Sequence, residues 1–256
     1  MNFVPSRIAP KLMQRFVANR ASSSITMHGS LYSQPSRSIF LLCNLNNIPY
    51  DFHLVDPVKG DTRKPGFMET SPTGLVPVIR DGNFCLSEAG AVLQYLCNRD
   101  KLRDWYPRCD QAQLRAQVDF WMSWHHTNTR VMTTSVLLPQ LFPVDAKTAD
   151  RVAEKVKVGL KTAGRALAFM ERHLEANGNR FLAGDEPSIA DLLILPEIDQ
   201  HLPEAFGFMD LSVYPNVTAW IDRCREHVGK HYVANFEPVL LMAAKMKKVR
   251  AAAEKA

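Results

Sequence analysis

The hydrophobic pattern of this chain changes near residue 100, and this change restricts its possible folds more than any other feature. Residues 25–96 follow the order strand, helix, strand, loop, strand, strand, helix. Beyond Asp100 the strand signals stop, and helical periodicity recurs over about 111–138, 147–177, 188–202, 215–228 and 231–249. The sequence therefore predicts an α/β domain over residues 27–103 and an all-α domain over residues 110–249, with a short tail at 250–256.

Residues 31–38 contain the end of the first predicted strand, over 25–32, and the start of the first predicted helix. Pro35 suits the first helical position, and Ser33 precedes it with a hydroxyl. A helix start leaves free backbone N–H groups and a positive dipole end, which favour a bound anion. The Ser33 hydroxyl could donate a hydrogen bond to a bound thiolate, or it could simply cap the helix. Tyr32 and Ser36 are rival hydroxyls, and strand alternation is expected to turn Tyr32 away from Ser33.

The element order of the first domain is that of a thioredoxin-like domain. A thioredoxin-like redox enzyme would carry Cys-x-x-Cys after the first strand, where this chain has Ser33 and Ser36. The missing sulfurs argue against a dithiol oxidoreductase. The cysteines are odd in number and widely spaced, which predicts reduced thiols in an intracellular compartment. They are Cys43, Cys85, Cys97, Cys109 and Cys224.

The first 26 residues are basic and contain no acidic residue. Arg7, Lys11, Arg15 and Arg20 accompany an apolar row and several serines. This composition predicts a mitochondrial transit peptide over residues 1–26, and the alternative is a disordered tail. The expected location is the mitochondrial matrix if the segment is a transit peptide, and the cytoplasm otherwise.

The net charge of +5 comes mostly from that first segment. Without its four basic residues, the balance falls to +1. A nearly neutral body argues against nucleic acid as a partner. No apolar run approaches the length needed to cross a bilayer, so membrane insertion is not expected.

Two further motifs are interpreted as structural. Ser188 and Asp191 have the spacing of a capping box ahead of a dense apolar run, so the carboxylate is predicted to bond the helix start. His125 and His126 are adjacent, and adjacent side chains on a helix diverge by about 100°. This spacing does not fit the i, i+4 ligand face of a helical metal site, and no metal is expected.

Several segments, taken in order, are similar to motifs of the glutathione transferase family. They are residues 32–37 (YSQPSR), 75–77 with 86–89 (LVP and LSEA), 181–191 and 214–220. The resemblance covers Ser30 to Val249. The Ser-Gln-Pro-Ser-Arg element, with Val55-Asp56 and Lys59-Gly60, is most like the theta class. The resemblance implies an α/β thioredoxin-like N-terminal domain followed by an all-α C-terminal domain.

The resemblance also implies a glutathione site in the first domain. Ser33 is similar to the family's thiol-activating serine. Pro77 is similar to the family's cis-proline, so Val76 would present its backbone to the cysteine part of glutathione. Glu88 would meet the γ-glutamyl amino group, although a carboxylate near a helix start is also favoured by the helix dipole alone.

Some positions depart from the family's pattern. Ala89 stands where the family has a serine, and Thr62 and Leu75 stand where theta enzymes often carry basic residues. Arg63 is still expected to bind the glycyl carboxylate, and Gln34 is a further expected glutathione contact. A lost hydrogen bond to a charged group costs roughly 1.5–3 kcal/mol, or more than tenfold in affinity. Weak glutathione binding, or use of a related thiol, is therefore a hypothesis to test.

The second domain is expected to supply contacts to a small hydrophobic electrophile. Trp124 and Arg130 are the candidates by resemblance, and the alternative for Arg130 is a solvated or ion-paired residue. The implied function is conjugation of glutathione, as co-substrate, to such electrophiles in detoxification by a homodimer. The alternatives are a non-catalytic assembly module and a glutathione-dependent peroxidase or reductase of the same fold.

Overall fold

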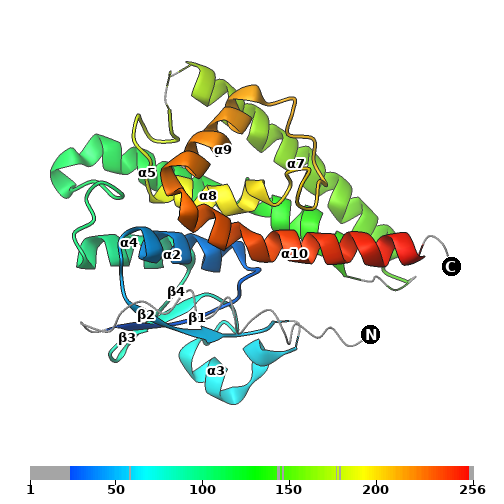
Figure 1. The fold of residues 1–256 in the computed structure, drawn as a ribbon, viewed down its shortest axis with the longest axis horizontal. Helices are drawn as coiled ribbons and strands as arrows, with labels where there is room; N and C mark the ends of the chain where they lie inside the picture. Colours follow the sequence, from blue (N-terminus) through cyan, green and yellow to red (C-terminus); the bar gives the residue numbers. More distant parts are fainter. Residues whose placement is uncertain are drawn as a thin grey trace. The chain divides into compact units, whose positions relative to one another are not determined.

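The computed structural model describes residues 24–57, 59–142, 145, 147–176, 178 and 180–253. The chain divides into two compact units, Met1–Tyr95 and Leu96–Ala256. The first unit is built around a β-sheet and the second is helical (Figure 1). The predicted order of an α/β domain and an all-α domain is confirmed.

The described residues of the first unit contain a mixed sheet in the order β2-β1-β3-β4. Its strands are β1 (Ile25–Gly29), β2 (Tyr50–Leu54), β3 (Val78–Asp81) and β4 (Phe84–Ser87). β1 runs parallel to β2 and antiparallel to β3, and β3 is antiparallel to β4. Ile25 and Met27 are fully buried while Thr26 and His28 are half-buried, as strand alternation requires.

Helices cover both faces of this sheet. α2 (Gln34–Leu45) and α4 (Ala89–Arg99) lie on one face, and the short α3 (Pro65–Thr70) lies on the other (Figure 1). Only a loop is predicted from the sequence where α3 and the 3₁₀ turn η1 (Asp61–Arg63) are found. Six residues are too few to show a helical period. The helix is held by Phe67, which packs with Val55 and Val78.

The second unit consists of helices that mostly match the predicted ranges. They are α5 (Ala112–His125), α6 (Leu138–Leu141), α7 (Ala149–Ala176), α8 (Ile189–Asp199), α9 (Pro215–Val228) and α10 (Lys230–Ala253). A 3₁₀ turn, η2 (Cys109–Gln111), precedes α5. The single helix predicted over 111–138 was wrong. The chain turns after His125 and then forms a π-helical segment, η3 (Met132–Leu137).

Helix α8 is buried along its whole length and begins with the predicted capping box. Ser188 caps the helix, and the carboxylate of Asp191 accepts from the Ser188 backbone N–H at 2.8 Å. The same carboxylate accepts from the Leu182 N–H at 3.0 Å and from the Trp220 indole at 2.9 Å. Asp191 therefore links α8 to α9 and to the segment before α8, in addition to capping its own helix.

The predicted transit peptide covers residues 1–26. All of it except its last three residues lies outside the described part of the chain. Ile25 and Thr26 belong to β1 and pair with Tyr50 and Asp51. The boundary at residue 26 therefore falls two residues inside the fold. A truncation that keeps the sheet intact has to end before Ile25, because that side chain is fully buried.

Candidate active site

The strand register gathers the ends of three strands at one edge of the sheet. His28 on β1 pairs with Val78 on β3, and Val78 pairs with Ser87 on β4. The residues after β1, before β3 and after β4 consequently lie at the same edge. Among them are the predicted site residues Ser33, Gln34, Val76, Pro77 and Glu88.

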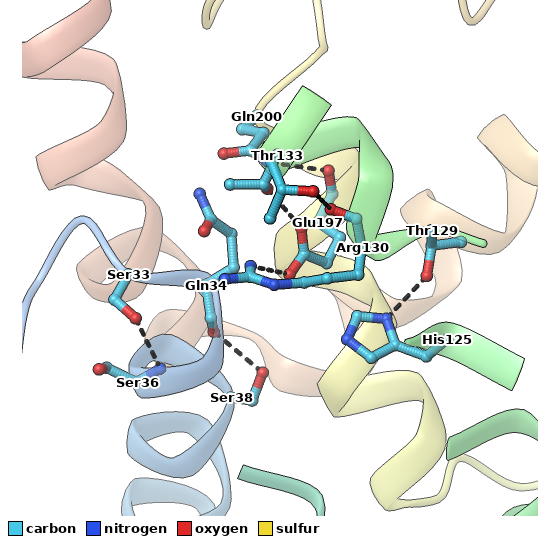
Figure 2. A network of polar contacts seen from close by, with 11 residues as sticks. Ser33, Gln34, Ser36, Ser38, His125, Thr129, Arg130, Thr133, Glu197 and Gln200 are labelled. Carbon is cyan, nitrogen blue, oxygen red and sulfur yellow. Dashed lines mark hydrogen bonds and ion pairs between the residues drawn. The ribbon is translucent and has the colours of Figure 1, made fainter. Parts of the chain in front are cut away.

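Ser33 is the N-cap of α2. Its hydroxyl oxygen accepts from the Ser36 backbone N–H at 3.4 Å, and its own N–H donates to the Ser30 carbonyl at 3.1 Å (Figure 2). The cap uses a lone pair of the oxygen and leaves the hydroxyl proton to be donated elsewhere. Capping and donation to a thiolate, which the sequence analysis treated as alternatives, are therefore compatible in one residue.

The rival hydroxyls have other surroundings. Ser36 is fully buried, and its oxygen accepts from the Ser30 N–H at 3.3 Å, which ties the first turn of α2 to the end of β1. Gly29 permits this close approach, since a Cβ there would lie 3.1 Å from the Ser36 hydroxyl. Burial, with a smaller contribution from Asp56, raises the pKa of the Tyr32 phenol. Strand alternation does not govern Tyr32, because β1 ends at Gly29 and Tyr32 lies in a turn.

Gln34 and the Val76–Pro77 peptide bond, which precedes β3, both belong to the sheet edge described above. The Gln34 side chain is buried, and its backbone carbonyl accepts from the Ser38 hydroxyl at 3.1 Å (Figure 2). The Val76–Pro77 peptide bond is cis. Val76 is half-buried against the cluster formed by Val55, Phe67 and Val78, and Pro77 is buried. The backbone here is thus supported from within the first unit.

Glu88 lies immediately before α4 with an unusual backbone. Its φ is +67°, in the left-handed region, which costs a non-glycine residue roughly 1–2 kcal/mol. Its carbonyl accepts from the Val92 N–H at 2.9 Å, so the strained residue starts the helix. The Glu88 side chain is exposed while Ala89 is buried. Such strain persists where the surroundings enforce it, and it is often found at ligand sites.

The positions that depart from the theta pattern differ in exposure. Arg63 in η1 is exposed, whereas Thr62 is buried. A Cβ added at Gly74 would lie 3.3 Å from the Thr62 carbonyl, so η1 packs beside the approach to Leu75. Leu75 is 61% exposed, so its side chain is an apolar group open to solvent. Arg63 is therefore a surface cation close to the chain that leads to Val76.

Trp124 belongs to an aromatic cluster within the second unit. Its ring centroid is 5.1 Å from that of Trp121 and 5.3 Å from that of Phe169, and Trp121 also contacts His173. Trp124 is half-buried, while Trp121 is fully buried. The cluster packs α5 against α7 and holds the Trp124 ring in place from one side.

Arg130 is paired with a buried carboxylate. Its guanidinium donates to Oε1 of Glu197 at 2.5 Å, and the Thr133 hydroxyl donates to the other oxygen of Glu197 (Figure 2). The Gln200 amide donates to the Thr133 hydroxyl at 2.6 Å. The ion pair is the structural alternative that the sequence analysis held open for Arg130. The Arg130 side chain nevertheless stays 29% exposed, whereas Glu197 is 1% exposed.

Sequence reasoning did not find Glu197, Thr133 or Gln200. For Glu197 the available signal was a carboxylate inside a predicted helix rich in apolar residues, where a buried charge needs a partner. The partner of Glu197 is 67 residues away along the chain, so no local pattern identifies it.

The adjacent histidines have separate environments. His125 is buried, and its Nδ1 lies 2.7 Å from the Thr129 hydroxyl (Figure 2). Burial, with smaller contributions from His126 and Arg130, lowers the pKa of His125 to about 3. The described residues contain no group of three or more His, Cys, Asp or Glu side chains suited to a metal. None of the described helices is both long and apolar enough to cross a membrane.

The family models that match this chain agree with the two-unit architecture. The model for the glutathione S-transferase N-terminal domain matches residues 27–104, and the model for the C-terminal domain matches residues 128–227. Among curated proteins, theta-1 glutathione S-transferase from Gallus gallus is 33% identical over 80% of this chain and 85% of its own length. The theta-2 enzyme of Rattus norvegicus is 33% identical over 80% and 82%.

Solved structures of theta-class enzymes share the fold. Human glutathione transferase theta-2, solved in complex with glutathione, has a TM-score of 0.73 and 27% identity over 88% of this chain and 91% of that chain. The apo form of human glutathione S-transferase T1-1 also has a TM-score of 0.73, with 27% identity over 86% and 91%. Together with the sequence matches, this shows that the chain belongs to the glutathione S-transferase family, as an enzyme similar to the theta class.

Proposed function

We propose that this enzyme conjugates glutathione to small hydrophobic electrophiles, with Ser33 donating a hydrogen bond to the glutathione thiolate. The observation that carries the proposal is the position of Ser33. Its hydroxyl caps α2 through an oxygen lone pair, at the sheet edge that also holds Val76 and Glu88. A donated proton and the positive end of the α2 dipole both favour a negatively charged sulfur.

The required stabilisation of the thiolate is modest. A free thiol has a pKa near 8.5, so only a few per cent is ionised at neutral pH. Lowering that pKa by about two units requires roughly 2.7 kcal/mol of preferential stabilisation of the thiolate. A charge-assisted hydrogen bond contributes about 1.5–3 kcal/mol and a helix N-terminus about 0.3–1 kcal/mol. The two sources together match the requirement.

The remaining glutathione contacts are proposed from position and chemistry. Val76 would pair its backbone with the cysteine part of glutathione, and the exposed carboxylate of Glu88 would meet the α-amino group. Arg63 is an exposed cation suited to the glycyl carboxylate. Gln34 is a further proposed contact. Because Ala89 lacks a hydroxyl, glutathione affinity is expected to be lower than a serine at that position would allow.

The electrophile is proposed to contact the second unit. Trp124 offers a half-buried aromatic surface, and Arg130 offers a cationic side chain that is partly exposed. An apolar ring and a hydrogen-bond donor suit a small hydrophobic molecule with a polar or leaving group.

Two substitutions of Ser33 test the proposal, because one removes the hydroxyl with little loss of helix stability and the other keeps the hydroxyl both as a cap and as a donor. Ser33→Gly removes the hydroxyl but costs a helix N-cap only a few tenths of a kcal/mol, whereas Ser33→Thr keeps both functions. The measurements are calorimetric titration with glutathione and ultraviolet absorbance of the bound thiolate against pH. We expect Ser33→Gly to bind glutathione, to shift the bound thiol toward a pKa of about 8.5, and to lose tenfold to a hundredfold in turnover near pH 7.

The outcomes are distinct. If Ser33→Gly ionises the bound thiol as wild type does, Ser33 is a cap only and the proposed role is refuted. If wild type binds no glutathione at millimolar concentration, the proposed co-substrate is refuted, and a related thiol becomes the next one to assay.

A further inference from the structure

Two locally unfavourable features coincide beside Arg130. Glu197 is a carboxylate with 1% exposure in a helix that is buried along its whole length. The segment η3 is π-helical over six residues, Met132–Leu137, a conformation that is rare and often found at functional sites. Burying an ion costs several kcal/mol before its partners compensate. When two such features occur at one place, their role there is expected to be functional and not to stabilise the local structure.

The contacts show what these features hold in place. One oxygen of Glu197 accepts a hydrogen bond from the Arg130 guanidinium at 2.5 Å. The other accepts a hydrogen bond from the hydroxyl of Thr133, which lies in η3. Gln200 donates both to the Thr133 hydroxyl at 2.6 Å and to the Glu197 backbone carbonyl at 3.0 Å. The carboxylate is thus held on one side by the partly exposed Arg130 and on the other by the buried Thr133, which is itself held by the buried Gln200. Figure 2 shows the side chains of Arg130, Thr133 and Gln200 gathered around Glu197.

The ion pair with Glu197 fixes the position of the Arg130 guanidinium. An arginine side chain carries about 2 kcal/mol of rotamer entropy, which is lost when the group is held in one geometry. Here the pairing with Glu197 restricts Arg130 before any ligand arrives, while 29% of the side chain remains exposed. Preorganised donors of this kind bind and orient a substrate with little further entropy loss.

We infer that Glu197 is a positioning residue for Arg130, and that Thr133 and Gln200 keep the Glu197 carboxylate in the orientation this requires. The inference rests on the proposed function, in which Arg130 contacts the electrophile. Glu197 itself does not touch the substrate. Its removal should therefore alter the kinetics of the electrophile and leave the binding of glutathione unchanged, because the proposed glutathione contacts belong to the first unit.

The test compares single and double variants of the full chain. Glu197→Gln keeps the size of the side chain and removes its charge, and Arg130→Ala removes the group that Glu197 is inferred to position. Initial rates with 4-nitrobenzyl chloride, a small hydrophobic electrophile with a chromophore, give KM and kcat for each substrate. We expect Glu197→Gln to lower kcat/KM for the electrophile tenfold to a hundredfold and to change KM for glutathione less than twofold. In the Arg130→Ala background, Glu197→Gln should have almost no further effect on kcat/KM.

Two more variants separate positioning from general destabilisation. Glu204→Gln breaks a more exposed ion pair, with Arg225 at 2.8 Å in the same unit, and should leave both KM values unchanged. If Glu197→Gln fails to fold, Thr133→Val removes one hydrogen bond to the carboxylate at constant shape and should lower kcat/KM for the electrophile severalfold.

The possible results show whether the proposed function fails or only the positioning role of Glu197. If Arg130→Ala leaves the electrophile kinetics unchanged, or wild type does not conjugate the probe, the proposed function fails and the inference fails with it. If Arg130→Ala impairs conjugation but Glu197→Gln and Thr133→Val do not, the inference alone is overturned. It is also overturned if the effects of Glu197→Gln and Arg130→Ala simply add.

Discussion

Replacing Asp191 by asparagine should destabilise the helical unit more than any conservative surface change. Among the described residues, each oxygen of this buried carboxylate accepts two hydrogen bonds. Oδ1 accepts from the Leu182 N–H and the Trp220 indole, and Oδ2 accepts from the backbone and hydroxyl of Ser188. Asparagine keeps one accepting oxygen and turns an NH₂ group toward the donors of the other. At about 1.5–3 kcal/mol for each bond lost to a charged acceptor, the expected loss is roughly 3–6 kcal/mol.

That loss is large beside the 5–15 kcal/mol or so that stabilises a typical domain. Urea unfolding followed by circular dichroism, with linear extrapolation, measures it directly. Asp222→Asn is the matched control, since Asp222 is 74% exposed, lies 3.8 Å from Arg225, and should change stability by less than about 0.5 kcal/mol. A loss below about 1 kcal/mol for Asp191→Asn would show that the desolvation of the carboxylate already offsets its hydrogen bonds, and would refute this reasoning.

Two further predictions concern packing and pH. A Cβ at Gly159 would lie 2.7 Å from the Ser135 Cβ, so Gly159→Ala should lower the free energy of unfolding by about 1–3 kcal/mol. Gly164 is in the same helix and its nearest contact would be at 3.8 Å, so Gly164→Ala should raise that free energy by about 0.5–1 kcal/mol. Equal effects of the two variants in urea unfolding would contradict this prediction. Because the folded pKa of His125 is about 3 and the unfolded value is about 6.5, the unfolded state binds the extra proton between these values, and stability should fall as pH drops below 6.5. The contribution of His125 at pH 5 is about 2 kcal/mol, and His125→Asn should remove that part of the difference between pH 8 and pH 5.

The sequence was sufficient for features that depend on neighbours along the chain. The change of periodicity near Asp100 separated the sheet-containing part from the helical part, because burial of one face imposes a period of two on strands and 3.6 on helices. Ser33 before Pro35, and Ser188 with Asp191, were found as caps because their partners are three residues away or fewer.

Short or irregular elements were beyond sequence reasoning. α3 has six residues and depends on one apolar anchor, Phe67, so it shows no period of its own. The break after His125 and the π-helical η3 follow from packing against α7, where Gly159 lets the two backbones approach closely. Tyr32 lies in a turn and not in the expected strand. The prediction that strand alternation turns Tyr32 away from Ser33 therefore does not apply.

By itself, the amino-acid sequence determined where the elements are, how they are capped, and which family of motifs they carry. Tertiary structure decided which polar groups meet inside the helical unit. Arg130 and Glu197 are 67 positions apart, so no local pattern identifies one as the partner of the other. A buried carboxylate in a low-dielectric interior requires a cation and hydrogen-bond donors nearby, and tertiary packing supplies them here by placing Arg130 and Thr133 beside Glu197.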